Sequence, residues 1–165
     1  MPPDRRRQAT VLTMPTERTP LLDGTVRVLE LARFGDERGS LVPITFDDLG
    51  FRVARTFIVT APRGAVRGGH AHRSVRQVLF RASGSIELEV RRDGVREHLT
   101  LDEACPAVLI EPGVWAQQTY LHDGSTLVVF ADGPYDADEY GDGESGDGES
   151  GDGESGDAES AATAS

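Results

Sequence analysis

The sequence predicts an all-β protein built as an antiparallel barrel or jelly roll, and three observations lead there. Short runs rich in β-branched residues follow one another between Gly, Pro and Asp-Gly turns. Nothing between the two chain ends sustains the helical period of about 3.6 residues. Asp93-Gly94 separates two alternating runs, which is a strong hairpin signal. Short strands at such close spacing favour a closed or double-sheet antiparallel architecture.

Taken in chain order, each expected strand is an apolar or alternating run that ends at a turn residue. The expected strands cover residues 25–33, 40–46, 52–60, 75–82, 85–92, 96–101, 107–111, 115–121 and 125–132. Asp123-Gly124 repeats the hairpin signal between the last two of these runs.

The two ends of the chain differ from this pattern. Residues 1–24 are rich in Pro, Arg and Thr without periodicity, and we expect a mobile arm that orders only against a partner subunit. Residues 141–165 repeat GDGES three times and then GDAES, without apolar positions to bury, which predicts a disordered acidic tail. Residues 25–140 are then one domain.

Composition excludes several classes of partner. The net charge of −11 argues against duplex nucleic acid and anionic membranes, although eight of the 28 acidic residues lie in the tail. The single cysteine, Cys105, excludes an intrachain disulfide and is expected as a small buried hydrophobe. No apolar run of about 18 residues and no secretory h-region occur. We therefore expect a cytoplasmic protein.

The segment that points to chemistry runs from Gly64 to Gly84. His70 and His72 are two residues apart, so both imidazoles point to one face if this segment is extended. Pro62 and the glycines before the pair indicate a turn at the rim of a pocket. An exposed histidine pair at the start of a strand is the structural alternative.

This segment resembles the first cupin motif, G-x5-H-x-H-x3/4-E-x6-G. Gly64, His70, His72 and Gly84 match it, and Gln77 stands in place of the glutamate. The resemblance implies a cupin-type jelly roll with the histidines inside it.

Residues 111–116, EPGVWA, resemble the second cupin motif, P-x-G-x-x-H, with Ala116 at the histidine position. Metal-bearing cupins bind the ion through the two histidines and the glutamate of the first motif and the histidine of the second. An amide is a poor substitute for a carboxylate and alanine has no donor atom, so we expect no metal and no cofactor. The histidines are then available for proton transfer.

A narrower resemblance covers about residues 28–140. The segments that carry it are DERGSLVPI (36–44), VRGGHAH (66–72), Gln77-Val78-Leu79 with Ser83-Gly84-Ser85, Pro112–Trp115 and YDADEY (135–140). Together they are similar to the WxcM-like sugar 3,4-ketoisomerases. The resemblance implies that a dTDP-4-keto-6-deoxyhexose has its ketone moved from C4 to C3 without a metal, in deoxy- or amino-sugar biosynthesis. It also implies a jelly-roll homodimer, often with exchanged strands.

The resemblance also implies roles for particular residues. His70 and His72 match the histidine pair to which catalysis is assigned; we expect His72 to be the main proton carrier and His70 its partner or the oxyanion donor, or the reverse. Arg67 would bind the diphosphate or the enediolate, unless it is an exposed turn residue.

Three further residues are candidate substrate contacts. Gln77 would hydrogen-bond to the substrate or satisfy a polar group in the barrel. Trp115 would stack on a sugar or thymine, with a place in the core as the alternative. Arg38 would lie near the subunit contact or the nucleotide.

Three departures from the family pattern leave other functions open. Ala116-Gln117 follows the tryptophan where His or Arg and then Glu are common, Phe57 replaces a frequent tyrosine, and the GDGES repeat displaces the C-terminal extension. A non-catalytic sugar-nucleotide-binding cupin is therefore one alternative. A 3,5-epimerase of the same fold is another.

Overall fold

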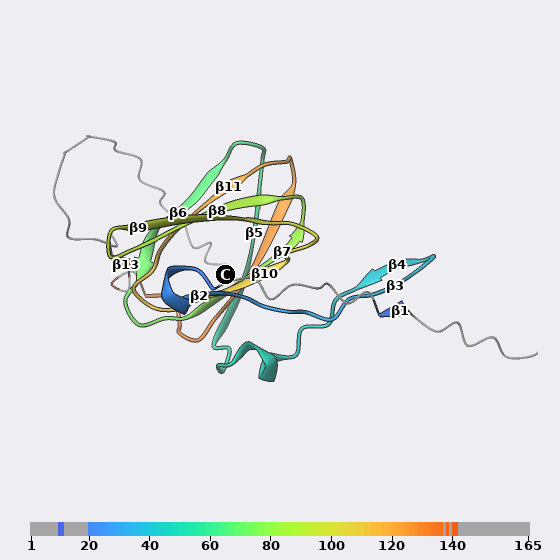
Figure 1. The fold of residues 1–165 in the computed structure, drawn as a ribbon, viewed down its shortest axis with the longest axis horizontal. Helices are drawn as coiled ribbons and strands as arrows, with labels where there is room; N and C mark the ends of the chain where they lie inside the picture. The colour runs from blue at the N-terminus through green and yellow to red at the C-terminus, as the bar shows by residue number, and fades with distance from the viewer. Residues whose placement is uncertain (1–9, 12–19, 137, 139, 142–165) are drawn as a thin grey trace, which may run out of the picture.

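The computed structural model describes residues 10–11, 20–136, 138 and 140–141 (Figure 1). Residues 10–11 and 20–24 of the expected arm and Gly141 of the expected tail are described, and the rest of both segments lies outside the described residues. Within the described residues, no helix is both long enough and apolar enough to cross a bilayer.

Two five-stranded antiparallel sheets make up the domain. The first sheet has the order β2 (Val26–Val28), β10 (Ala107–Ile110), β7 (Gln77–Ser83), β12 (Ser125–Ala131) and β5 (Arg55–Ala61). The second has the order β13 (Tyr140–Gly141), β6 (Val66–His72), β11 (Trp115–Tyr120), β8 (Ile86–Arg92) and β9 (Val95–Leu101). Apart from the consecutive strands β8 and β9, neighbours in each sheet are far apart in sequence, as a jelly roll requires, so the predicted fold class is confirmed.

The main core lies between the two sheets. It is built from inward-facing aliphatic side chains of both sheets, including Leu79, Ile86, Leu88, Val108 and Leu127, none more than 2% exposed. Alternation along the strands causes this, because successive side chains point to opposite faces. Cys105 is fully buried in this core, as expected for a single cysteine that acts as a small hydrophobe.

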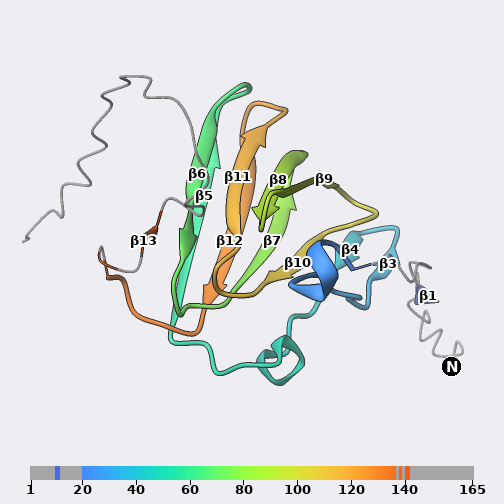
Figure 2. The same cartoon turned by 60° about the vertical axis from the view of Figure 1, so that its left-hand side comes forward.

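A smaller sheet projects from the barrel. It contains β1 (Thr10–Val11), β3 (Phe34–Asp36) and β4 (Gly39–Leu41), and Figures 1 and 2 show the β3–β4 hairpin reaching away from the two main sheets. Two 3₁₀ turns precede and follow the β3–β4 hairpin in sequence: η1 (Leu22–Gly24) and η2 (Phe46–Leu49).

The Asp-Gly turns behave differently from one another. Asp93 and Gly94 both have positive φ, 50° and 76°, and join β8 to its neighbour β9, so this predicted hairpin is confirmed. The prediction of a hairpin at Asp123-Gly124 is wrong. The turn is present, but it connects β11 in the second sheet to β12 in the first, because each strand already has two other neighbours.

Two expected strands are much shorter in the structure, and β1, β3, β6 and β13 were not expected. Residues 29–33 and 42–46 are outside any strand, and Pro43 lacks the N–H that a ladder needs. The segment Val66–His72, read as a turn leading into the histidines, is strand β6 throughout. Its glycines are tolerated there because the strand contains a bulge, described below.

Candidate active site

A cavity opens between the two sheets, and the predicted histidines lie in it. Its apolar lining comes mainly from the first sheet: Phe57, Val59, Leu79, Ile110, Leu127 and Val129. Its polar lining comes mainly from the second sheet and the segments that follow the strands: Arg67, His70, His72, Gln77, Glu111, Gln118, Tyr120 and Tyr140. A concave, largely apolar site with a few convergent polar groups is typical of a small-molecule site.

A bulge in β6 brings Arg67 into this cavity. In a regular strand Arg67 would point away from His70 and His72, because their positions differ by an odd number. The pairing with β11 shifts between Ala116 and Gln117, and both Gly68 and Gly69 have positive φ, 76° and 83°. The extra residue reverses the alternation, so Arg67 lines the same cavity as the histidines.

We call His70, His72, Gln77 and Tyr140 the histidine end of the cavity. The imidazole centroids of His70 and His72 are 5.2 Å apart at an interplanar angle of 81°. Gln77 Nε2 lies 2.9 Å from His72 Nε2. An amide nitrogen donates, so this imidazole nitrogen accepts and the neutral ring carries its proton on Nδ1. The contact fixes the orientation of the His72 ring, and Nε2 becomes available to take a proton when the Gln77 amide turns to another partner.

Burial changes the protonation of His70. Desolvation lowers the pKa of His70 below its ordinary value of 6.5, and a hydrogen bond to the Gly68 backbone opposes this in part. The imidazole is therefore neutral at neutral pH, in the form that can accept a proton.

Tyr140 belongs to the histidine end and was not singled out from the sequence. Strand β13 pairs Tyr140 with His72, and the phenol ring lies 4.4 Å from the His70 ring and 5.1 Å from the His72 ring. Tyr140 is the last residue of the segment YDADEY, which carries part of the family resemblance but gives Tyr140 no role. The pairing joins residues nearly seventy positions apart, which local patterns do not indicate.

We call Arg67, Gln118 and Tyr120 the tyrosine end. These residues lie on the paired strands β6 and β11, where Gln118 stands opposite Arg67 and the Tyr120 N–H donates to the Ala65 carbonyl at 2.9 Å. Tyr120 is fully buried, and its hydroxyl has no hydrogen-bond partner among the described residues. Burial raises the Tyr120 pKa, and the nearby Arg67 charge opposes this rise. The phenol therefore stays protonated and can donate.

The donor atoms of the cavity do not fit a cupin metal centre. His70 stands opposite Ala116 in the β6–β11 ladder, and His72 is hydrogen-bonded to the Gln77 amide. The Glu111 carboxylate also lines the cavity, but it pairs with Arg27 at 3.4 Å, and no cluster of three or more His, Cys, Asp and Glu occurs in the described part of the chain.

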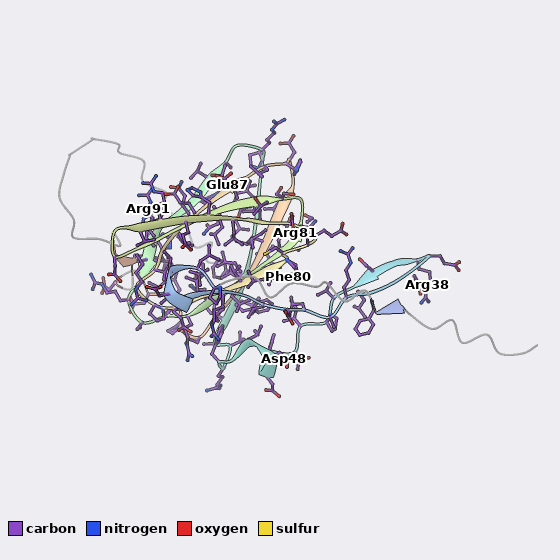
Figure 3. The ribbon with its side chains drawn as sticks, viewed as in Figure 1. Arg38, Asp48, Phe80, Arg81, Glu87 and Arg91 are labelled. Carbon is purple, nitrogen blue, oxygen red and sulfur yellow. The ribbon has the colours of Figure 1, made fainter. Side chains whose placement is uncertain are left out.

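Two predicted substrate contacts lie outside this cavity. Trp115 is 9% exposed and points to the other face of β11, where the Arg91 guanidinium lies 4.1 Å from its ring centroid. Arg38 lies on the projecting β3–β4 hairpin, where it pairs with Asp36 (Figure 3). Their roles as substrate contacts stay predictions. Phe57 and Ala116, which depart from the family pattern, both line the cavity.

Fold and site together define a cupin-type jelly roll with a histidine pair inside the barrel. The family model FdtA, described as WxcM-like, C-terminal, matches residues 24–144, and the chain belongs to this family.

Known relatives agree with this assignment. The chain is 28% identical over 116 residues to a TDP-4-oxo-6-deoxy-α-D-glucose-3,4-oxoisomerase of Aneurinibacillus thermoaerophilus, covering 69% of this chain and 84% of the relative. It is 26% identical to QdtA, a sugar 3,4-ketoisomerase of Thermoanaerobacterium thermosaccharolyticum solved with TDP, with a TM-score of 0.67 over 72% of this chain and 88% of QdtA. It also shares the fold of ChmJ, a 3'-monoepimerase of Streptomyces bikiniensis, at 22% identity and a TM-score of 0.66 over 74% and 71% of the two chains.

Proposed function

We propose that the protein is a metal-independent sugar 3,4-ketoisomerase that converts a dTDP-4-keto-6-deoxyhexose to its 3-keto isomer. The observation that carries the proposal is the histidine end. There a half-buried neutral imidazole, an imidazole oriented by an amide and a phenol ring meet inside the cavity of a chain that belongs to the FdtA family. The relatives' activities support the same substrate class.

The reaction needs only proton transfers. A base removes the proton from C3, and the electron pair moves to form the C3–C4 double bond of an enediolate with its charge on the C4 oxygen. That oxygen gains a proton, the C3 hydroxyl loses one to become the ketone, and C4 receives a proton. His72 is the main proton carrier because it contacts His70, Gln77 and Tyr140. His70 donates to or accepts from the enediolate oxygens.

Arg67 is the cationic group that faces the cavity from the tyrosine end. A guanidinium stabilises the developing negative charge of an enediolate or binds a phosphate. The neutral phenol of Tyr120 and the amide of Gln118 lie beside it as hydrogen-bonding groups for the sugar hydroxyls.

The enzyme is a homodimer in this proposal, and it works in the cytoplasm where nucleotide sugars are made. The β3–β4 hairpin extends beyond the barrel (Figure 1). Its residue Leu41 is 64% exposed in the single chain. A partner barrel would cover this hairpin and bring Arg38 toward the partner's nucleotide. Light scattering of the full chain should give twice the monomer mass, and removal of residues 34–41 should give a monomer.

Proton NMR with dTDP-4-keto-6-deoxyglucose in deuterated buffer tests the reaction. We expect a 3-keto product with deuterium at C4, and the configuration there shows which face of the enediolate is protonated. Exchange at C3 and C5 with the ketone still at C4 would identify a 3,5-epimerase instead.

A non-catalytic binding protein is the second candidate, because Phe57 and Ala116, the two departures from the family pattern noted in the sequence, both line the cavity. Saturable dTDP-sugar binding without exchange of any sugar proton would establish it. Restoring Phe57→Tyr would then be expected to produce measurable exchange.

A further inference from the structure

Arg55, at the start of β5, is a cation that the catalytic proposal does not use. It is half-buried, its Nε is shielded from solvent, and no described residue accepts a hydrogen bond from that atom. Several other arginines of the described residues pair with carboxylates, as Arg76 does with Asp132 at 2.8 Å. Arg33 also has a buried Nε without an acceptor, but its Nη2 pairs with Glu103. A buried guanidinium nitrogen without an acceptor is uncommon, because its desolvation is then not compensated.

Two aromatic rings hold the Arg55 guanidinium in place. Its central carbon lies 4.9 Å from the Phe57 ring centroid and 5.4 Å from the Tyr135 ring centroid. Phe57 lines the cavity, whereas Tyr135 is 61% exposed and lies at the surface. The guanidinium therefore lies where the cavity wall meets solvent, with its planar donor fork held by ring contacts.

Sheet register places Arg55 beside the histidine end. Ala131 of β12 pairs with Arg55 on one side and with Gln77 on the other, so the three residues form one row across the first sheet. Two strand spacings of about 4.8 Å separate the Arg55 and Gln77 backbones. Aromatic contacts complete the link, because the Tyr135 and Tyr140 centroids are 6.2 Å apart and Tyr140 contacts both histidines.

We propose that Arg55, held between Phe57 and Tyr135, is the binding site for the diphosphate of the nucleotide-linked sugar. This inference rests on the proposed function, which makes the ligand a nucleoside diphosphate sugar. The diphosphate leaves the hexose at C1, across the ring from the reacting C3 and C4. A sugar held with C3 and C4 at the histidines therefore presents its diphosphate a short distance away, and Arg55 is a cation at that distance with an unused donor.

Phosphate is the ligand chemistry that suits this site. A planar guanidinium binds phosphate oxygens through two parallel N–H donors, and an ammonium group does not reproduce that geometry. The rings exclude water from one part of the guanidinium, which strengthens its attraction for an anion. Tyr135 acts as a positioning residue, because its ring contacts the guanidinium and not the histidines.

Calorimetric titration with dTDP tests the site without relying on turnover. Arg55→Met keeps an unbranched chain that packs on both rings but removes the charge, and we expect dTDP affinity to fall at least tenfold. Arg55→Lys keeps the charge without the fork and should recover only part of the loss. Inorganic pyrophosphate should compete with dTDP in the wild-type protein and should compete much less in Arg55→Met.

Arg52→Gln is the matched control, because Arg52 is an exposed arginine three residues away and its loss changes net charge in the same way. It should bind dTDP within about twofold of wild type, since an exposed charge at this distance acts only weakly. The melting temperatures of the unliganded variants show whether Arg55 also supports the fold, and if Arg55→Met does not fold, Arg55→Lys still tests the donor fork.

The outcomes separate this site from the proposed function. Unchanged dTDP affinity in both Arg55→Met and Arg55→Lys would overturn the site while leaving the isomerase in place. Wild-type binding of dTDP that weakens in Arg55→Met, without any sugar isomerisation, would support the site and remove the isomerase. Failure of the wild-type protein to bind dTDP would overturn both.

Discussion

The two ends of the cavity satisfy their polar groups in different ways. At the histidine end, His70, His72, Gln77 and Tyr140 contact one another across three strands, so each side chain is positioned by the others. At the tyrosine end, the Tyr120 hydroxyl is fully buried and has no acceptor or donor among the described residues.

This difference indicates which end is organised before the substrate binds. Catalytic groups need a geometry that does not depend on the ligand, and mutual packing at the histidine end provides it. A buried hydroxyl without a partner is costly in the empty protein and gains a hydrogen bond when a polar ligand arrives. The tyrosine end is therefore suited to binding and the histidine end to chemistry. Five predictions test this division.

His72→Asn should have the largest effect. Because His72 is the proton carrier of the histidine end, its loss should lower kcat by about a thousandfold while dTDP binding stays within a few-fold. The exposed strand residue His98 supplies the matched control, and His98→Asn should leave kcat unchanged. Wild-type turnover in His72→Asn would remove the assignment of this role.

Gly68→Ala should disrupt the bulge that lies between the two ends. Gly68 has φ +76°, and an added Cβ would lie 2.7 Å from the Ala116 carbonyl oxygen. Left-handed strain and overpacking together should reduce the free energy of unfolding by about 2–5 kcal/mol.

Gly64→Ala is the matched control for the bulge, because Gly64 has φ +82° but open space around its Cα. Strain alone should cost about 1–2 kcal/mol there. Denaturant unfolding measures both variants, and equal losses would show that the contact with Ala116 is unimportant.

Tyr140→Ala should reduce the ordering of the histidine side chains while leaving the side chains of the tyrosine end in place. Removing the ring that packs on His70 and His72 should lower kcat about tenfold or more, with KM changing less. Tyr140→Phe keeps the ring and should stay within about threefold of wild type. If Phe is as damaging as Ala, then the hydroxyl takes part in the reaction and the role is more than positioning.

Tyr120→Phe changes the tyrosine end and should increase the stability of the unliganded protein. It removes a buried hydroxyl without a described partner, so the free energy of unfolding should rise by about 1 kcal/mol. The KM for the sugar nucleotide should rise at the same time, because the ligand loses its hydrogen bond. Steady-state kinetics and urea unfolding of the same variant would show whether the rise in KM and the rise in the free energy of unfolding occur together. A loss of stability would contradict the prediction.

The smallest effect is the pH dependence that His70 confers. Its pKa is lowered by burial, so the unfolded chain binds more protons than the folded one between the lowered pKa and 6.5. The stabilising contribution is therefore complete above pH 6.5 and is lost as the pH falls below it. The melting temperature of the wild type should decline over this acid range more than that of His70→Gln, and parallel curves would contradict the assignment.

Local patterns in the sequence were sufficient for the fold class and for the histidine pair. Alternation of apolar residues determines which side of a strand is buried, and Asp93-Gly94 forms the turn of a hairpin between the consecutive strands β8 and β9. His70 and His72 share a face in any extended segment. Each of these features depends on residues close together in the chain, which is why a single sequence is enough to predict them.

Tertiary pairing decided the rest. Tyr140 reaches the histidines only because β13 pairs with β6, and Arg67 faces the cavity only because a bulge shifts the β6–β11 register. The turn at Asp123-Gly124 joins two sheets because β11 and β12 find other neighbours. Such choices depend on side chains far apart in sequence competing for the same strand edges and the same core, and no local pattern records which pairing is more stable.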